Sequence, residues 1–93
     1  MTSVVRAGLS GDNHMYTVYV LRDLNGKLYK GMTNDLERRL KEHRSGKTQT
    51  TSRMHGIALV YKEELPAFIE ARRRELYFKT AAGRRFLKKK LGD

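Results

Sequence analysis

The stretch YTVYVLRDLNGKLYKG, residues 16–31, decides the fold of this chain. Residues 16–21 are all β-branched, aromatic or aliphatic, and residues 27–31 combine basic with apolar side chains, as strands with one exposed face commonly do. Between these two runs, Asn25-Gly26 is the strongest short signal for a turn that joins antiparallel strands. The stretch therefore predicts a β-hairpin, which needs further cover because a lone hairpin is marginal in water.

The residues after the hairpin predict a helix, a loop and a third strand. Capping side chains precede residues 35–45, and Glu37 follows Asn34 by three positions, so we expect a helix there with a start like a capping box. Residues 47–56 are rich in Thr, Ser and Lys and predict a basic, mobile loop. Residues 57–61 are an apolar run that predicts a buried strand.

Two more helices complete the predicted domain. Pro66 is tolerated in a first helical turn and is expected to open one helix, which residues 81–83 (Ala-Ala-Gly) are expected to break. Residues 84–91 predict a final short basic helix. Residues 16–93 are thus expected to form a single domain, preceded by residues 1–15 as a flexible leader or an expression-vector remnant.

The predicted fold class follows from this order of elements. The order β-β-α-β-α-α is that of an α/β (more strictly α+β) fold. In it, a small three-stranded sheet that begins with the hairpin is flanked by helices.

Composition narrows the class of partner. The 93 residues include 20 Lys and Arg against 10 Asp and Glu, and the net charge of +10 favours a polyanionic partner, above all nucleic acid. The absence of cysteine excludes disulfides, thiolate metal sites and a cysteine nucleophile, and it suits a cytoplasmic location. The sequence has no Gly-rich phosphate loop, and its apolar runs are far shorter than the roughly 20 residues that span a membrane. We therefore expect a cytoplasmic protein with no membrane partner and no small-molecule cofactor.

A few residues are of the types that phosphodiester hydrolysis uses. A phenol can handle the proton of an attacking water, a guanidinium can hold a phosphate oxygen, and a carboxylate can bind a divalent metal. Each residue also has an ordinary structural explanation, since strand tyrosines pack across strands and helical carboxylates pair with nearby lysines. The candidates are Tyr19, Tyr29, Gly31, Arg39 and Glu75.

Their arrangement along the chain is more specific than any one of them. Residues 17–19 (Thr-Val-Tyr) and 29–31 (Tyr-Lys-Gly) lie on the paired strands of the hairpin, Arg39 lies on the next helix, and residues 71–76 (ARRREL) contain Glu75 on a later helix. This ordered set resembles the GIY-YIG nuclease superfamily over residues 16–91. It is most similar to the small stand-alone members, which are YhbQ-like and similar to the UvrC N-terminal domain.

The resemblance implies a divalent-metal-dependent endonuclease that hydrolyses DNA phosphodiester bonds. It implies that Tyr19 is the general base or a water-positioning phenol and that Tyr29 is its hydrogen-bonding partner. Arg39 would bind the scissile phosphate, and Glu75 would hold Mg²⁺ or Mn²⁺. Gly31 would let the backbone come close to the active-site strand.

Other residues are expected to assist. His43, one turn beyond Arg39, has three interpretations: it contacts phosphate, it assists proton transfer, or it only packs the helix. Contacts to the nucleic-acid backbone without a chemical role are expected from Lys47, Arg53, Arg84, Arg85 and Lys88.

The sequence also departs from the family pattern. Thr17 stands at the first Gly of the family name, Lys30 stands at the middle Ile, and no Asn follows Glu75. Without an appended targeting domain, we expect branched, damaged or distorted DNA, as in DNA repair, recognised by its shape or through a targeting or activating protein. The alternatives are a catalytically weak or inactive nucleic-acid-binding module of the same fold and, on charge alone, an RNA-binding protein.

Overall fold

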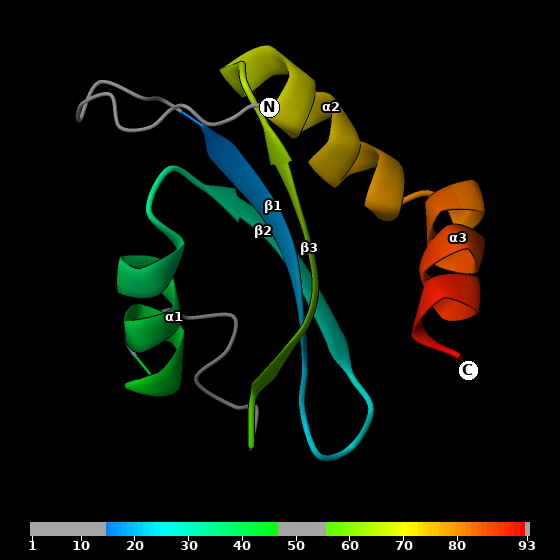
Figure 1. Ribbon diagram of the computed structural model, residues 1–93. Helices are drawn as coiled ribbons and strands as arrows, with labels where there is room; N and C mark the ends of the chain where they lie inside the picture. The colour runs from blue at the N-terminus through cyan, green and yellow to red at the C-terminus, as the bar shows by residue number, and fades with distance from the viewer. Residues whose placement is uncertain (1–14, 47–55, 93) are drawn as a thin grey trace.

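The structure is a computed structural model that describes residues 15–46 and 56–92. Its elements are β1 (Tyr16–Arg22), β2 (Leu28–Thr33), α1 (Leu36–Arg44), β3 (Ala58–Leu65), α2 (Phe68–Phe78) and α3 (Ala81–Leu91). The strands form an antiparallel sheet in the order β2-β1-β3, with α1 on one side and α2 and α3 on the other (Figure 1). The predicted fold class and element order are confirmed.

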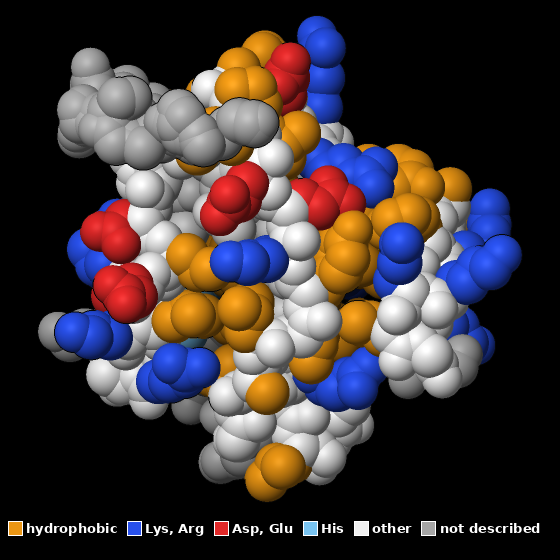
Figure 2. All heavy atoms as spheres, in the orientation of Figure 1, with side chains coloured by type: hydrophobic (Ala, Val, Ile, Leu, Met, Phe, Trp, Pro, Cys, Tyr) orange, Lys and Arg blue, Asp and Glu red, His pale blue; other side chains and the backbone are white. Residues whose placement is uncertain are grey.

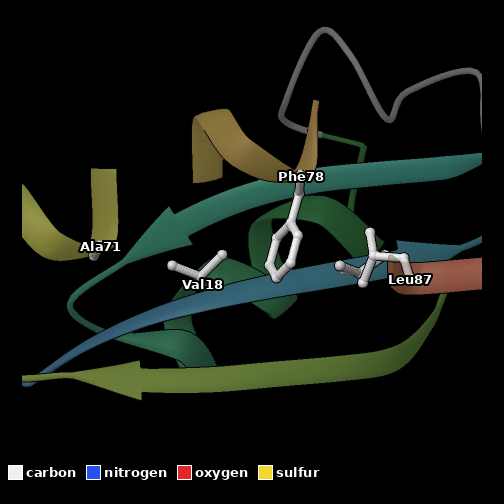
Figure 3. Packing of buried hydrophobic residues seen from close by; sticks show 5 residues of the cluster. Val18, Ala71, Phe78 and Leu87 are labelled. Atoms are coloured by element: carbon white, nitrogen blue, oxygen red, sulfur yellow. The ribbon is translucent and has the colours of Figure 1, made fainter. Parts of the chain in front are cut away.

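The central strand β1 is buried along its middle and supplies both faces of the sheet. Successive side chains of a strand point to opposite faces. Val18 and Val20 therefore point toward α2 and α3, where they form a core cluster with Ala71, Phe78 and Leu87 (Figure 3). Tyr19 points the other way, toward α1, so the same strand supports the core on one face and a functional side chain on the other.

The turn of the hairpin is held by one aspartate. The Asp23 carboxylate accepts hydrogen bonds from the backbone N–H groups of Asn25, at 3.0 Å, and Lys27, at 2.8 Å. Gly26 has φ 84°, a left-handed conformation that glycine adopts without steric cost. Leu21 pairs with Tyr29 across the strands, so the Asn25-Gly26 signal predicts the hairpin correctly.

Helix α1 starts one residue later than the capping-box interpretation implies. The N-cap is Asp35, not Asn34, because the Asp35 carboxylate accepts a hydrogen bond from the Arg38 N–H at 3.1 Å. Glu37 instead lies in the first turn, where a negative charge suits the helix dipole. The Asn34 side chain is left exposed beside the helix start.

The predicted break at residues 81–83 is wrong, because these residues already belong to α3. The Thr80 side chain caps the helix by accepting a hydrogen bond from the Gly83 N–H at 3.1 Å. A Cβ at Gly83 would lie 1.9 Å from the Tyr77 carbonyl oxygen of α2. The glycine therefore allows close contact between two helices and does not end one.

The other boundaries differ by short segments. Helix α2 begins at Phe68, because Ala67 after Pro66 keeps an extended backbone with φ −129° and ψ 144°. Strand β3 extends beyond the apolar run to Leu65, with exposure that alternates as expected of an edge strand covered on one face. The predicted leader, except Met15, and the predicted loop, except Gly56, lie outside the described residues.

Basic side chains are a visible feature of one side of the molecule. Figure 2 shows Lys and Arg side chains projecting on the side of the molecule where α3 lies, interspersed with apolar groups. In residues 15–46 and 56–92, no helix has the length and hydropathy needed to cross a membrane.

Candidate active site

Three aromatic rings from different elements meet on the α1 side of the sheet. Tyr19 of β1 is only 1% exposed, and its hydroxyl lies 2.8 Å from Nε2 of His43 on α1. The Tyr29 ring from β2 lies 4.9 Å from the His43 ring and 6.2 Å from the Tyr19 ring, measured between centroids. His43 thus packs directly against both tyrosines. The same contact that packs α1 onto the sheet also brings the imidazole to the Tyr19 hydroxyl.

Gly31 makes room for the Tyr19 side chain. It lies opposite Tyr19 in the strand pairing, and a Cβ built on it would be 2.6 Å from the Tyr19 hydroxyl oxygen and 3.0 Å from the Tyr29 ring. The sequence predicts a close backbone approach at Gly31, and the group that approaches is the phenol. Glycine is the residue whose lack of a Cβ leaves this hydroxyl where it meets His43.

The protonation states of this cluster follow from its surroundings. Burial, and next the proximity of Tyr29, raise the pKa of Tyr19 to about 12, and hydrogen bonding to Arg39 opposes them. Burial, and next the positive charge of Arg39, lower the pKa of His43 below its usual range. At neutral pH Tyr19 is therefore a phenol and His43 a neutral imidazole, whose Nε2 can accept the phenol's hydrogen bond when Nδ1 carries the proton.

Arg39 is positioned on α1 so that it faces the tyrosines. Its Nη1 donates a hydrogen bond to Oε1 of Glu42, one turn further along the helix, at 2.8 Å. The Glu42 hydrogen bond, and next the hydrogen bond to Tyr19, raise the pKa of Arg39 above its ordinary value. A permanently charged, half-buried guanidinium suits the binding of a phosphate oxygen.

Glu75 brings a carboxylate from α2 to the same region. The residue is 7% exposed, and its Oε1 and Oε2 accept hydrogen bonds from Arg72 Nη1 at 2.8 Å and from Lys79 Nζ at 3.2 Å. These partners lie three residues before and four residues after Glu75 on the helix, so all three side chains share one helix face. Two cations thus hold the carboxylate where a divalent ion would compete with them.

Tyr19, Tyr29, Arg39 and Glu75 line one pocket of about 500 Å³, which is open to solvent beside the edge strand β2. The walls come from β1, β2, the start of α1 and α2, elements that lie far apart in the sequence. Glu75 is the acidic residue among the lining side chains, and Arg39 and Arg72 are the cations. The full lining is Tyr16, Tyr19, Tyr29, Gly31, Met32, Thr33, Asn34, Arg39, Phe68, Arg72 and Glu75.

Comparison with known proteins agrees with this arrangement. Residues 15–90 match the family description "GIY-YIG catalytic domain". The chain belongs to the GIY-YIG family. This is a family of nuclease domains whose substrate is DNA and whose members usually use divalent metals.

Relatives of this GIY-YIG domain come from several bacteria. It is 40% identical over 70 residues to a UPF0213 protein of Bacillus pumilus, covering 74% of this chain and 71% of the relative. It is 41% identical over 66 residues to the UPF0213 protein CPE1444 of Clostridium perfringens, covering 70% and 71%. The solution NMR structure of the UPF0213 protein BH0048 from Bacillus halodurans superposes with a TM-score of 0.50 and 34% identity, covering 78% of this chain and 81% of that one.

The donor set of this GIY-YIG pocket fits a hard divalent cation that keeps most of its water. Within the described residues, no group of three or more His, Asp or Glu side chains is placed to hold a metal ion. Mg²⁺ commonly binds through one or two carboxylates and completes its shell with waters and substrate phosphates. Glu75 alone therefore suits such an ion, provided that Arg72 and Lys79 release it.

The predicted backbone contacts that the structure describes are not brought to the pocket. Arg84, Arg85 and Lys88 are exposed on α3, which contributes nothing to the pocket lining. Burial, and next the positive charges of Arg84 and Lys79, lower the pKa of Lys30 on β2, so basic groups gather between α3 and the edge strand. The other predicted contacts, Lys47 and Arg53, lie outside the described residues.

Some lining residues of the GIY-YIG domain escape prediction from sequence. Arg72 looks like an ordinary helix charge, although its spacing of three from Glu75 gives a hint. Asn34 looks like a helix cap and instead lines the pocket. Tyr16 and Phe68 look like strand and helix packing residues, and no local pattern places them together at the pocket.

Proposed function

We propose that this GIY-YIG domain is a divalent-metal-dependent endonuclease that hydrolyses DNA phosphodiester bonds. The observation that carries the proposal is the convergence of Tyr19, Arg39 and Glu75, from β1, α1 and α2, on one pocket. A proton-handling group, a phosphate-binding cation and a metal-binding carboxylate are the parts that such a hydrolysis needs.

The proton of the attacking water passes through Tyr19 to His43. A phenol with a pKa of about 12 is protonated at neutral pH and is not a ready phenolate base. His43 Nε2, 2.8 Å away, receives the Tyr19 proton while the Tyr19 oxygen takes a proton from water as the water attacks phosphorus. This assigns proton transfer to the Tyr19–His43 pair, which is one of the three interpretations that the sequence leaves open for His43. Tyr29 holds the His43 ring in place by an edge contact.

The scissile phosphate lies against the two pocket cations. Arg39 and Arg72 line the pocket from different helices and would bind its non-bridging oxygens, where negative charge builds in the transition state. Glu75 would hold Mg²⁺ or Mn²⁺, which when bound stabilises the charge on the phosphate and on the leaving oxygen. Arg72, once displaced from Glu75, becomes available to the phosphate.

The proposal also covers which DNA the enzyme would cut. The pocket is a small open feature of a basic domain, and nothing in its lining suits the recognition of a long base sequence. We assign branched, damaged or distorted DNA as the substrate, with a DNA-repair role in the cytoplasm, and either DNA shape or a targeting protein directs the enzyme.

The deciding experiment compares Glu75→Gln with Glu70→Gln, an exposed glutamate on the same helix that does not line the pocket. Both variants and the parent protein are incubated with labelled duplex, single-stranded, nicked, flapped and four-way-junction DNA in Mg²⁺, Mn²⁺ or EDTA. We expect metal-dependent cutting by the parent and by Glu70→Gln, and none by Glu75→Gln. Cutting that persists in EDTA or in Glu75→Gln would overturn the proposal.

A second candidate is a nucleic-acid-binding module with little catalytic power. It is favoured by one observation, the pairing of both Glu75 oxygens with Arg72 and Lys79, which leaves the carboxylate neutralised without a metal. Salt-sensitive DNA binding by all three proteins without cutting on any substrate would support it.

A further inference from the structure

The rim of the pocket carries an aromatic pair that the proposed chemistry does not use. Phe68, the first residue of α2, is 55% exposed, although a large apolar side chain gains free energy by burial. Its ring meets the Tyr16 ring edge to face, with centroids 5.8 Å apart and planes at 77°. Both rings line the pocket that holds Tyr19, Arg39 and Glu75.

The position of Phe68 separates it from the other exposed apolar side chains. Ile69 and Leu76 on α2 are similarly exposed, at 58% and 46%, and neither lines the pocket. Leu24 is exposed at the tip of the hairpin, far along β1 from the pocket end. Of the described residues with a large exposed apolar side chain, Phe68 is the one at the pocket.

Phe68 is also held beside the cations that would bind phosphate. Arg72 follows Phe68 by four residues, so the two side chains share one face of α2, and both line the pocket. A nucleotide whose phosphate contacts Arg72 could place its base at the N-terminal end of that face, beside the Phe68 ring. Aromatic rings next to guanidinium groups are the usual means by which proteins bind unpaired nucleotides.

We propose that Phe68, supported by Tyr16, is a stacking platform for an unpaired nucleobase adjacent to the scissile phosphate. The inference rests on the proposed function for the position of that phosphate. A base inside a duplex has both faces covered by its neighbours, so the platform selects DNA in which a base at the cut is unstacked. Phe68 is thus a positioning residue, and its contribution is to substrate choice and alignment.

Binding without cutting tests the platform. In the Glu75→Gln background and in EDTA, affinities are measured for a single-stranded oligonucleotide and for a blunt duplex of the same sequence. The variants are Phe68→Ala, Phe68→Leu, Phe68→Tyr and the neighbouring control Ile69→Ala. Since stacking contributes about 1–3 kcal/mol per base, we expect Phe68→Ala to weaken single-strand binding about tenfold, with duplex affinity unchanged.

The conservative variants separate stacking from apolar contact. We expect Phe68→Tyr to bind like the parent, Phe68→Leu to bind like Phe68→Ala, and Ile69→Ala to change neither affinity. A 2-aminopurine placed in the single strand should be quenched by the parent and by Phe68→Tyr, but not by Phe68→Leu. Full binding by Phe68→Leu, equal decreases for single strand and duplex, or an equal decrease in Ile69→Ala would overturn the platform.

The binding test distinguishes a failure of the platform from a failure of the nuclease proposal. A protein that never cuts but shows Phe68-dependent single-strand binding would keep the platform and remove the nuclease. A protein that cuts with metal but binds single strands equally well without the Phe68 ring would keep the nuclease and remove the platform. Since the Phe68 ring is exposed, we expect each variant to unfold at the same temperature as the parent protein, as measured by circular dichroism.

Discussion

The Tyr19 hydroxyl and His43 Nε2 form a pair behind the pocket wall, and the protonation state of each depends on the other. Their 2.8 Å hydrogen bond lies in a buried cluster where the pKa of Tyr19 is raised and that of His43 is lowered, first by burial in both cases. Each shift favours the neutral form, so the pair can pass a proton without first separating charge. This is a property of two particular side chains, and it exists because Gly31 leaves space for one of them.

A pH profile tests the role of His43. The imidazole accepts a proton only when neutral, so cleavage should fall as pH falls through the His43 pKa, which lies below the usual value for histidine. His43→Ala should lower the rate by about 10²-fold, within the range for removal of a general base, and should abolish that acidic limb. Single-turnover cleavage across the acidic and neutral pH range measures both. An acidic limb that survives in His43→Ala would show that another group titrates there.

The space beside Tyr19 can be tested at Gly31. Gly31→Ala places a methyl group 2.6 Å from the Tyr19 hydroxyl, so we expect a decrease of about 1–3 kcal/mol in the free energy of unfolding and a loss of cleavage. Urea denaturation measures the free energy of unfolding, and the same substitution is made in Tyr19→Phe as a control. Without the Tyr19 hydroxyl the clash is partly relieved, so the effects of the two substitutions on stability should be non-additive. Additive effects would mean that Gly31 does not act through the phenol.

At the scale of elements, helix α2 controls access to Glu75. Arg72 and Lys79, one turn before and one turn after, hold the two carboxylate oxygens. These pairs stabilise the carboxylate when no metal is present, and they would compete with a metal ion bound there. Under the proposed function, α2 would therefore set the affinity of the metal site as well as its position.

Removing one competitor should strengthen metal binding. We expect Arg72→Ala to raise the affinity for Mn²⁺ by about fivefold in the absence of DNA, because a partly exposed ion pair contributes up to about 1 kcal/mol. Electron paramagnetic resonance of free Mn²⁺ measures this without reference to cleavage. Arg73→Ala, an exposed neighbour outside the pocket, is the control and should leave the affinity unchanged. Weaker binding in Arg72→Ala would mean that Arg72 organises the site.

The sequence predicts which helices and strands form, whereas the residues at which they end and the contacts between them depend on packing. The hairpin follows from Asn25-Gly26 and the strand-favouring residues around it, both local features. Gly83 looks like a helix breaker locally, but its function is set by the Tyr77 carbonyl of another helix. Asn34 and Asp35 are equally good caps by residue type, and the backbone geometry selects Asp35. Each wrong prediction concerns an interaction partner that the local sequence does not specify.

The site shows the same division. Tyr19, Tyr29, Arg39 and Glu75 can be predicted because their order along the chain matches a family pattern, and the structure places all four at one pocket. The contact of His43 with Tyr19 spans 24 positions in sequence, and the pairing of Tyr16 with Phe68 spans an even longer separation. Such contacts require the sheet order and the helix positions, which the sequence alone does not give.

At the scale of the whole molecule, the charge of +10 includes a basic group on α3 that lies apart from the pocket. Lys88, Lys89 and Lys90 form the last turn of that helix, away from the pocket lining. Cations that neutralise DNA phosphates release counterions, so they make binding salt-dependent without affecting chemistry. We expect α3 to supply this kind of affinity.

Replacing Lys88, Lys89 and Lys90 with alanine should lower the salt slope of DNA binding, by about 0.9 for each phosphate that is no longer neutralised. Affinities measured between about 50 and 200 mM salt, where binding changes steeply, give the slope. Cleavage at saturating enzyme should remain within about twofold, since these residues do not touch the phosphate that reacts. An unchanged slope would place the bound DNA on another face.

The side chains on one face of α2 have a fixed spacing. Phe68, Arg72 and Glu75 follow one another at intervals of four and three along a single face, and an α-helix rises about 1.5 Å per residue, so about 10 Å separates the first from the last. Under the proposed function and the proposed stacking platform, α2 would hold the base, the phosphate and the metal at fixed spacings along the bound strand. One residue inserted between Phe68 and Glu75 would rotate the residues beyond it by about 100° around the helix axis, and the three side chains would no longer share one face.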